Sequence, residues 1–221
     1  ATGSWAQVIA NHPQLEELLI VEINPGYSEV VTANTTVSSL LTNEKVELII
    51  DDGRRFMQRN ADEKFDLIIM NTTFHWRAYA ANLLSRDFLN IVLARLNRGG
   101  IAFYNSTNSM NVQKTGAAVC PHALRFQNHM LCGNEEIEID TTRLADILWS
   151  YEIDGVRQHD RGDEQHRNRI AEIIQMFDAS RYGFTTATDF DTYPLESSRS
   201  ILQRTEANFI ITDDNMGDEW N

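Results

Sequence analysis

Residues 17–24 read ELLIVEIN, residues 46–53 read VELIIDDG, and residues 65–73 read FDLIIMNTT. Each run is short, rich in Ile, Leu and Val, and apolar on both faces. This pattern is typical of strands in a parallel sheet that helices cover on both sides. The three runs therefore predict an α/β protein.

Polar residues close each of these runs: Glu22 the first, Asp51 and Asp52 the second, and Asn71 the third. In open α/β sheets, ligands bind just beyond the carboxyl ends of the strands. A carboxylate at such an end, after a glycine turn, suits the two hydroxyls of a ribose. We therefore expect a nucleoside-containing ligand at this edge of the sheet.

Helix and strand signals alternate along residues 1–135, the predicted core. Helices are expected around residues 4–11, 27–34, 54–60 and 85–96, the last ended by Gly99 and Gly100, with a fourth strand around 101–107. That order predicts a doubly wound, mostly parallel, Rossmann-like sheet. Such a sheet opens with a strand that leads into the glycine turn. The sequence begins inside that turn, so we expect the first strand to be missing from it.

Residues 136–221 predict a helical C-terminal part of the same domain. Helices are expected around 141–151, 163–177 and 196–204, with a last short strand at 208–212. Residues 123–131 are a further strand candidate.

Charge limits the classes of partner. The 221 residues include 32 Asp and Glu against 19 Lys and Arg, so the formal net charge is -13. A nucleic-acid binder needs an excess of basic residues on its binding face, so no nucleic-acid partner is expected. Cationic small substrates are compatible with this charge, and so is an acidic surface that only promotes solubility.

The sequence contains no apolar run of about 18 residues, so no transmembrane segment is expected. Cys120 and Cys132 lack metal-ligand spacing, and the six His include no HxxxH pair, so no metal site is predicted. Two cysteines do not suggest a disulfide framework, and a reducing, cytoplasmic location fits them. The oligomeric state is left open, with a homodimer among the alternatives.

Four motifs follow one another in a recognisable order and spacing over nearly half the chain. They are GSWAQVIANHPQLEELLIVEINPGYSEVV at 3–31, VELIIDDGRRFM at 46–57, FDLIIMNTT at 65–73 and FLNIVLARLNRGGIAFYN at 88–105. Together they resemble the spermidine synthase family, aminopropyltransferases built on the class I S-adenosylmethionine-dependent methyltransferase fold. The resemblance implies S-adenosylmethionine or decarboxylated S-adenosylmethionine as the donor and a small-molecule acceptor.

The resemblance implies roles for the residues at the strand ends. Gly3 and Ser4 fall in the glycine turn that passes close to the nucleoside. Glu22 matches the acid that holds the ribose hydroxyls. Asp52, followed by Gly53, matches the acid that receives the adenine amino group.

The acceptor half of the site departs from the family's pattern. Asn71 stands where the family carries its catalytic aspartate, and Asn71 and Thr72 are also expected to contact the donor. The loop NTTFHW at 71–76 contains no acid. Aminopropyl transfer needs a base for the attacking amine and carboxylates for a polyamine cation, and Asn supplies neither. A classical diamine acceptor is therefore in doubt. The candidate catalytic residues are Asn71, because of its position, and His75, because it is the titratable side chain of this loop.

His75, Trp76 and Arg77 bring a titratable, an aromatic and a cationic group to this loop. Such a trio favours an anionic or aromatic acceptor. The alternative is a loop packed by its own aromatic side chains. Whether the protein catalyses transfer of a methyl or aminopropyl group is left open.

Structural explanations compete with each of these roles. Glu22 could be a solvated strand end, Asp51 and Asp52 could form a turn that caps the following helix, and 71–73 could be a polar loop. A different function also fits: a catalytically inactive nucleoside-binding or regulatory module of a larger, possibly membrane-attached protein.

Overall fold

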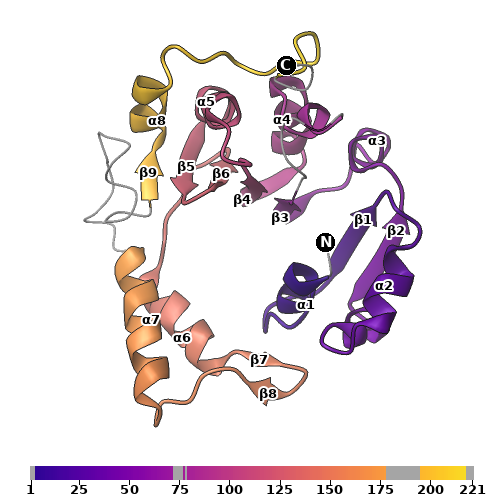
Figure 1. Cartoon of the computed structure of the whole chain (residues 1–221), viewed down its shortest axis with the longest axis vertical. Helices are drawn as coiled ribbons and strands as arrows, with labels where there is room; N and C mark the ends of the chain where they lie inside the picture. The colour runs from indigo at the N-terminus through magenta and orange to yellow at the C-terminus, as the bar shows by residue number, and fades with distance from the viewer. Residues whose placement is uncertain (1–2, 72–76, 78, 178–194, 218–221) are drawn as a thin grey trace. The chain divides into compact units, whose positions relative to one another are not determined.

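The computed structural model describes residues 3–71, 77, 79–177 and 195–217. The chain forms two compact units, one from residues 1–56 and 140–174, the other from residues 57–139 and 175–221 (Figure 1). The division predicted from the sequence is into a core, 1–135, and a C-terminal part, 136–221. Each unit contains segments from both of these parts, and that division stays a prediction.

The first unit is built on β1 and β2, which pair in parallel with Glu22 opposite Ile50. Apolar side chains of α1, α2 and η1 form its core around Tyr27, Val31 and Leu40. The elements of this unit are α1 (Ser4–Ala10), β1 (Leu18–Glu22), α2 (Tyr27–Ala33), η1 (Ser38–Thr42), β2 (Val46–Ile50), α6 (Thr141–Ser150), β7 (Glu152–Ile153), β8 (Val156–Arg157) and most of α7 (Glu164–Met176). The helix α3 (Gly53–Arg59) begins in it.

The second unit contains a five-stranded sheet in the order β3-β4-β6-β5-β9. The pair β3 and β4 is parallel, and the remaining neighbours are antiparallel. Its elements are β3 (Phe65–Met70), η2 (Ala81–Leu83), α4 (Arg86–Leu93), β4 (Leu96–Asn105), α5 (Met110–Val119), β5 (His122–Phe126), β6 (His129–Gly133), β9 (Leu195–Ser197) and α8 (Ser198–Arg204). The predicted parallel pairing is thus found for β1 with β2 and for β3 with β4.

Local signals explain where most of these elements begin. Ser85 caps α4 by accepting a hydrogen bond from the Phe88 N–H, and Asp140 caps α6 in the same way from Arg143. Asp154 and Gly155, both with positive φ, form the two-residue turn between β7 and β8.

Gly99 and Gly100 do not end a helix but lie inside β4, which begins already at Leu96. The register of β3 against β4 shifts between Phe65 and Leu67, so the two glycines occupy an irregular part of the ladder. A Cβ on Gly100 would lie 2.9 Å from the Phe65 carbonyl oxygen, which is closer than side-chain carbons come. Close approach of the β3 backbone therefore requires glycine here.

Two other C-terminal predictions need correction. Residues 123–131 form not one strand but the β5–β6 hairpin, because the chain reverses at Gln127, whose φ is positive. Residues 208–212 are not a strand, and the edge position beside β5 is taken by β9. Within the described ranges, every helix is too short or too polar to cross a membrane.

A buried carboxylate between two arginines holds the C-terminal segment of the second unit, β9 and α8, against β5. Glu196 of β9 is fully buried and accepts hydrogen bonds from Arg125 Nε at 2.6 Å and from Arg204 Nε at 2.7 Å. The Ser200 hydroxyl donates a further bond to it at 2.9 Å. Burial would raise the pKa of Glu196, but the hydrogen bonds and charges of Arg204 and Arg125 outweigh that effect and lower the pKa.

We expect Glu196→Gln to lower the free energy of unfolding by about 3–5 kcal/mol, because it removes the buried carboxylate that pairs with both guanidinium groups. Glu135→Gln, which breaks the exposed pair with Arg98, is the matched control and should cost about 0–1 kcal/mol. Since the folded-state pKa of Glu196 is depressed, its contribution is complete at neutral pH and is lost as the pH falls below about 4.3. Urea unfolding at pH 7 and pH 3 measures both effects, and equal losses for the two variants would contradict the assignment.

Cys120 and Cys132 form a disulfide with a Cα–Cα distance of 5.5 Å, and both are buried. The sequence predicted no disulfide framework, and this single disulfide departs from that expectation. The β5–β6 hairpin returns the chain to the end of α5 after 12 residues, which brings the two cysteines together. The cytoplasmic location stays a prediction.

Reduction of this disulfide should lower the free energy of unfolding by about 2–4 kcal/mol, because the bond closes a loop in the unfolded chain. Urea unfolding with and without a phosphine reductant measures the difference. The Cys120→Ala, Cys132→Ala double variant serves as the control, because its stability should not respond to the reductant. Two titratable thiols in the unfolded, non-reduced protein would show that the bond does not form.

Candidate nucleoside site

The acids that close β1 and β2 lie at the same edge of the first unit's sheet. Glu22 is the last residue of β1, and the Asp51 N–H donates to the Glu22 carbonyl oxygen at 3.1 Å. This bond continues the parallel ladder by one residue beyond Ile50. The predicted convergence of Glu22 and Asp51–Asp52 is therefore found within this unit.

The Glu22 side chain is half-buried and takes part in the turn that follows its strand. Its Oε1 accepts a hydrogen bond from the Asn24 N–H at 2.8 Å, and Asn24 Oδ1 accepts one from the Gly26 N–H at 3.0 Å. The first of these bonds sets the direction of the Glu22 carboxylate, and the second closes the turn. A carboxylate offers about four acceptor positions, so one backbone bond leaves Glu22 with capacity for ligand hydroxyls.

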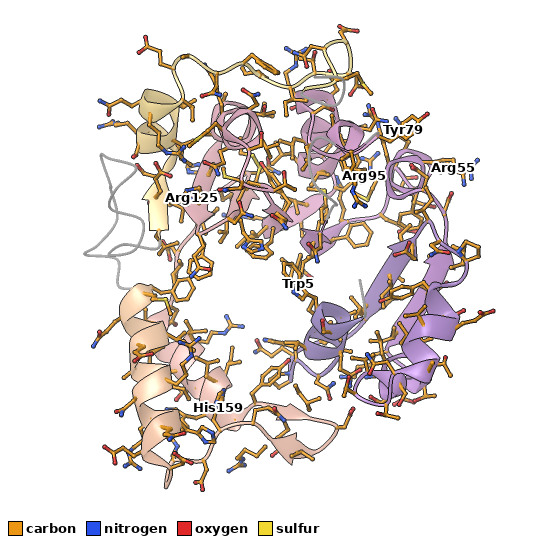
Figure 2. All side chains as sticks on the ribbon, viewed as in Figure 1. Trp5, Arg55, Tyr79, Arg95, Arg125 and His159 are labelled. Atoms are coloured by element: carbon orange, nitrogen blue, oxygen red, sulfur yellow. A yellow bond between two sulfur atoms is a disulfide. The ribbon has the colours of Figure 1, made fainter. Side chains whose placement is uncertain are left out.

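Asp52 caps α3, as the structural alternative proposed. Its Oδ1 accepts a hydrogen bond from the Arg55 N–H at 2.8 Å, and Asp51 pairs with the Arg55 guanidinium, with Nε at 2.6 Å. Arg55 projects from α3 (Figure 2). A Cβ on Gly53 would meet no atom of the described residues within 4 Å, so their packing does not require glycine there. A cap uses part of the acceptor capacity of Asp52 and leaves the rest available.

Gly3 begins the first helix in a left-handed conformation, with φ 81°. A Cβ at this position would lie 3.2 Å from Val31 Cγ2 and 3.4 Å from the Tyr27 hydroxyl. Glycine therefore meets two needs here, the positive φ and the close approach to α2. Ser4 follows as the first residue of α1 and is exposed.

Tyr27 lies beside the candidate residues and was not named in the sequence analysis. It is buried at the start of α2, and its hydroxyl lies beside Gly3. Burial raises the pKa of Tyr27, and the negative charge of Glu22 raises it further. Tyr27 thus stands between the glycine turn and the acid of β1. Its position directly after the Asn24-Pro25-Gly26 turn was the available signal.

Asn71 follows β3 in the second unit and is exposed. Thr72, His75 and Trp76 lie outside the described residues, and Arg77 is exposed. The roles of Asn71, Thr72 and His75 stay predictions.

A polar loop at the carboxyl end of β4 was also missed. Asn105 Oδ1 accepts hydrogen bonds from the Thr107 N–H at 2.8 Å and from Asn128 Nδ2 at 3.0 Å. Asn128 Oδ1 in turn accepts one from the Ser106 hydroxyl at 2.7 Å. Thr107 and Asn108 both have positive φ, which is rare for residues with a side chain and is concentrated at functional sites. The run Asn-Ser-Thr-Asn-Ser was the only sequence signal.

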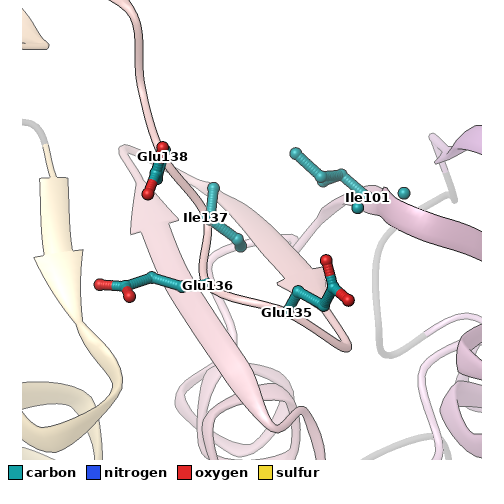
Figure 3. Close-up of a pocket in the computed structure, with 7 residues that line it drawn as sticks. Ile101, Glu135, Glu136, Ile137 and Glu138 are labelled. Atoms are coloured by element: carbon teal, nitrogen blue, oxygen red, sulfur yellow. The ribbon is translucent and has the colours of Figure 1, made fainter.

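A pocket of about 480 Å³ lies elsewhere in the second unit (Figure 3). Gly99–Ile101 and Glu135–Glu138 line it, and its carboxylates are exposed. Gly99–Ile101 belong to the first half of β4, away from the carboxyl end at Asn105. This pocket therefore contains none of the predicted site residues.

Comparisons with known proteins identify the family of this chain. The family model of the spermine/spermidine synthase domain matches residues 2–123, more than half of the chain. A polyamine aminopropyltransferase of Thermoplasma volcanium is 38% identical over 88 residues, which are 39% of this chain and 32% of that protein. One from Halorhodospira halophila is 30% identical over 105 residues, which are 46% of this chain and 37% of that protein.

The matches span about a third of the length of these curated relatives. The structure is similar in fold to human methyltransferase-like protein 13, solved in complex with SAH, with a TM-score of 0.52. That similarity covers 66% of this chain and 74% of the human chain at 20% sequence identity. The α/β, Rossmann-like, methyltransferase-type fold is thereby confirmed, and the chain belongs to the spermine/spermidine synthase family.

Proposed function

We propose that this protein binds S-adenosylmethionine or its decarboxylated form and transfers a group from it to a small acceptor. The observation that carries the proposal is that Glu22 and Asp52 lie at the adjacent carboxyl ends of β1 and β2. The backbone bond from the Asp51 N–H to the Glu22 carbonyl oxygen holds these two strand ends together. Gly3 and Tyr27 complete that edge of the first unit.

The donor supplies a carbon activated by a sulfonium, so the protein's task is to hold and align it. Glu22 accepts hydrogen bonds from the ribose hydroxyls, and Asp52 accepts one from the adenine amino group. Gly3, with its positive φ, gives the backbone turn that passes close to the nucleoside. Ser4, Gly53 and Thr72 complete the contacts to the donor.

Asn71 and His75 act on the acceptor. A neutral Asn orients the acceptor by hydrogen bonding but takes no proton, so His75 is the group that can serve as base. Arg77 adds a positive charge, which disfavours a diamine and suits an acceptor with a carboxylate. The methyl and aminopropyl alternatives differ in the donor, and the binding experiment below separates them.

Glu22→Ala should weaken binding of the preferred donor by about 1.5–3 kcal/mol, the range for a hydrogen bond to a charged group. Calorimetric titration with S-adenosylmethionine, its decarboxylated form and methylthioadenosine measures the loss and identifies the donor. Glu29→Ala is the matched control, because Glu29 is an exposed acid on α2 of the same unit. If the folded wild-type protein binds none of the three at millimolar concentration, the proposal is wrong.

Spermidine formation from putrescine and decarboxylated S-adenosylmethionine should be absent or far below the enzyme median of about 10 per second. The reason is the neutral Asn71 at the position of the family's aspartate. Asn71→Asp should raise this rate, because it restores a carboxylate that can accept the amine proton and attract a polyamine. Rapid formation by the wild-type protein, measured by chromatography, would contradict this acceptor assignment.

A further inference from the structure

A carboxylate from the C-terminal half of the first unit meets the glycine-turn helix. Asp154 lies at the tip of the β7–β8 hairpin, in the two-residue turn with Gly155. Its two oxygens accept hydrogen bonds from Gln7 Nε2 at 3.1 and 3.0 Å and from the Ser39 hydroxyl at 2.9 and 2.8 Å. Gln7 Nε2 also donates to the Ser39 hydroxyl oxygen at 2.7 Å, so the three side chains form a closed triad.

The Gln7 amide depends on this triad. Gln7 is only 3% exposed, and its Oε1 has no hydrogen-bond partner among the residues that the structure describes. The amide is therefore held through Nε2 alone. Removing the carboxylate would leave a buried donor with a single hydroxyl partner, and unmet buried polar groups are costly.

Gln7 and Ser39, the two partners of Asp154 in the triad, are both close to Gly3. The Gln7 N–H donates to the Gly3 carbonyl oxygen at 2.8 Å, in the first turn of α1. Ser39 precedes Leu40, whose Cδ2 lies 3.4 Å from the place where a Gly3 Cβ would be. One carboxylate thus fixes α1, which Gly3 begins, and η1, against which Gly3 packs.

Other contacts keep the hairpin at this place. The Asp154 N–H donates to Asn11 Oδ1 at 2.9 Å, and Asn11 Nδ2 donates to the Gln7 carbonyl oxygen at 2.9 Å. The Tyr151 hydroxyl donates to the Val8 carbonyl oxygen. The hairpin is therefore bonded to Gln7 in the middle of α1 and to Asn11 at its C-terminal end, and these bonds set the direction of the Asp154 carboxylate.

We propose that Asp154 is a positioning residue, which through Gln7 and Ser39 fixes the Gly3 turn for nucleoside binding. This inference rests on the proposed function, because it assigns the turn to the nucleoside. Loss of the triad should therefore weaken nucleoside binding in protein that is still folded.

Asp154→Asn tests the charge while keeping the turn, because Asn tolerates a positive φ. It should raise the dissociation constant for the tightest-binding of the three nucleosides by about tenfold. Amide hydrogen exchange in residues 4–11 should accelerate as well. Glu152→Gln on the same hairpin, which breaks only the exposed pair with Arg157, should change neither measurement.

The exchange variant Gln7→Glu, Asp154→Asn restores one carboxylate and one amide in swapped positions. It should recover most of the affinity and the exchange protection, whereas Gln7→Glu alone places two carboxylates together and should lose more than Asp154→Asn. Circular dichroism at the binding temperature verifies that each variant is folded.

The outcomes separate the two proposals. Wild-type protein that binds a nucleoside, with Asp154→Asn unchanged in affinity and in exchange of residues 4–11, overturns the positioning role and leaves the proposed function standing. Wild-type protein that binds no nucleoside overturns both. Lower affinity and faster exchange in Asp154→Asn, without recovery in the exchange variant, would also refute the triad, because the effect would then not depend on the carboxylate–amide pair.

Discussion

Parallel pairing of β1 with β2 is the constraint on which the candidate site depends. Parallel strands end at the same edge, so the pairing of Glu22 with Ile50 brings two separate acidic turns together. The bond from Asp51 N–H to the Glu22 carbonyl oxygen extends the ladder into those turns. An antiparallel pair of the same sequences would place the acids at opposite ends, and no nucleoside edge would form.

Each unit closes on a polar anchor that joins residues far apart in the chain. In the second unit, Glu196 ties β9 to β5 and α8 through two arginines, 71 and 8 residues away. In the first unit, Asp154 ties the β7–β8 hairpin to α1 and η1. Glu196 and the Gln7 amide are buried, whereas Asp154 itself is exposed. Buried polar groups are costly unless their partners are in place, so each anchor favours one arrangement of its segments.

The two halves of the proposed site follow different physical rules. Donor binding needs acceptors and a close backbone, which Glu22, Asp52 and Gly3 provide while they also serve the local turns. Acceptor chemistry needs a group that changes its protonation state, and Asn71 does not. A family member can therefore keep the first half while the second diverges, because caps and turns preserve the donor residues for structural reasons as well.

The sequence by itself determined the first three strands, the second half of the fourth, the parallel pairing and the acids at the strand ends, because those signals are apolar runs, caps and turns. Only the tertiary structure decided that Gly99 and Gly100 lie in a strand and that Cys120 meets Cys132. It also decided the Asp154–Gln7 contact, which spans 147 residues. The physical reason is that these contacts depend on which surface the returning chain covers, and such a choice leaves no periodic pattern in the sequence.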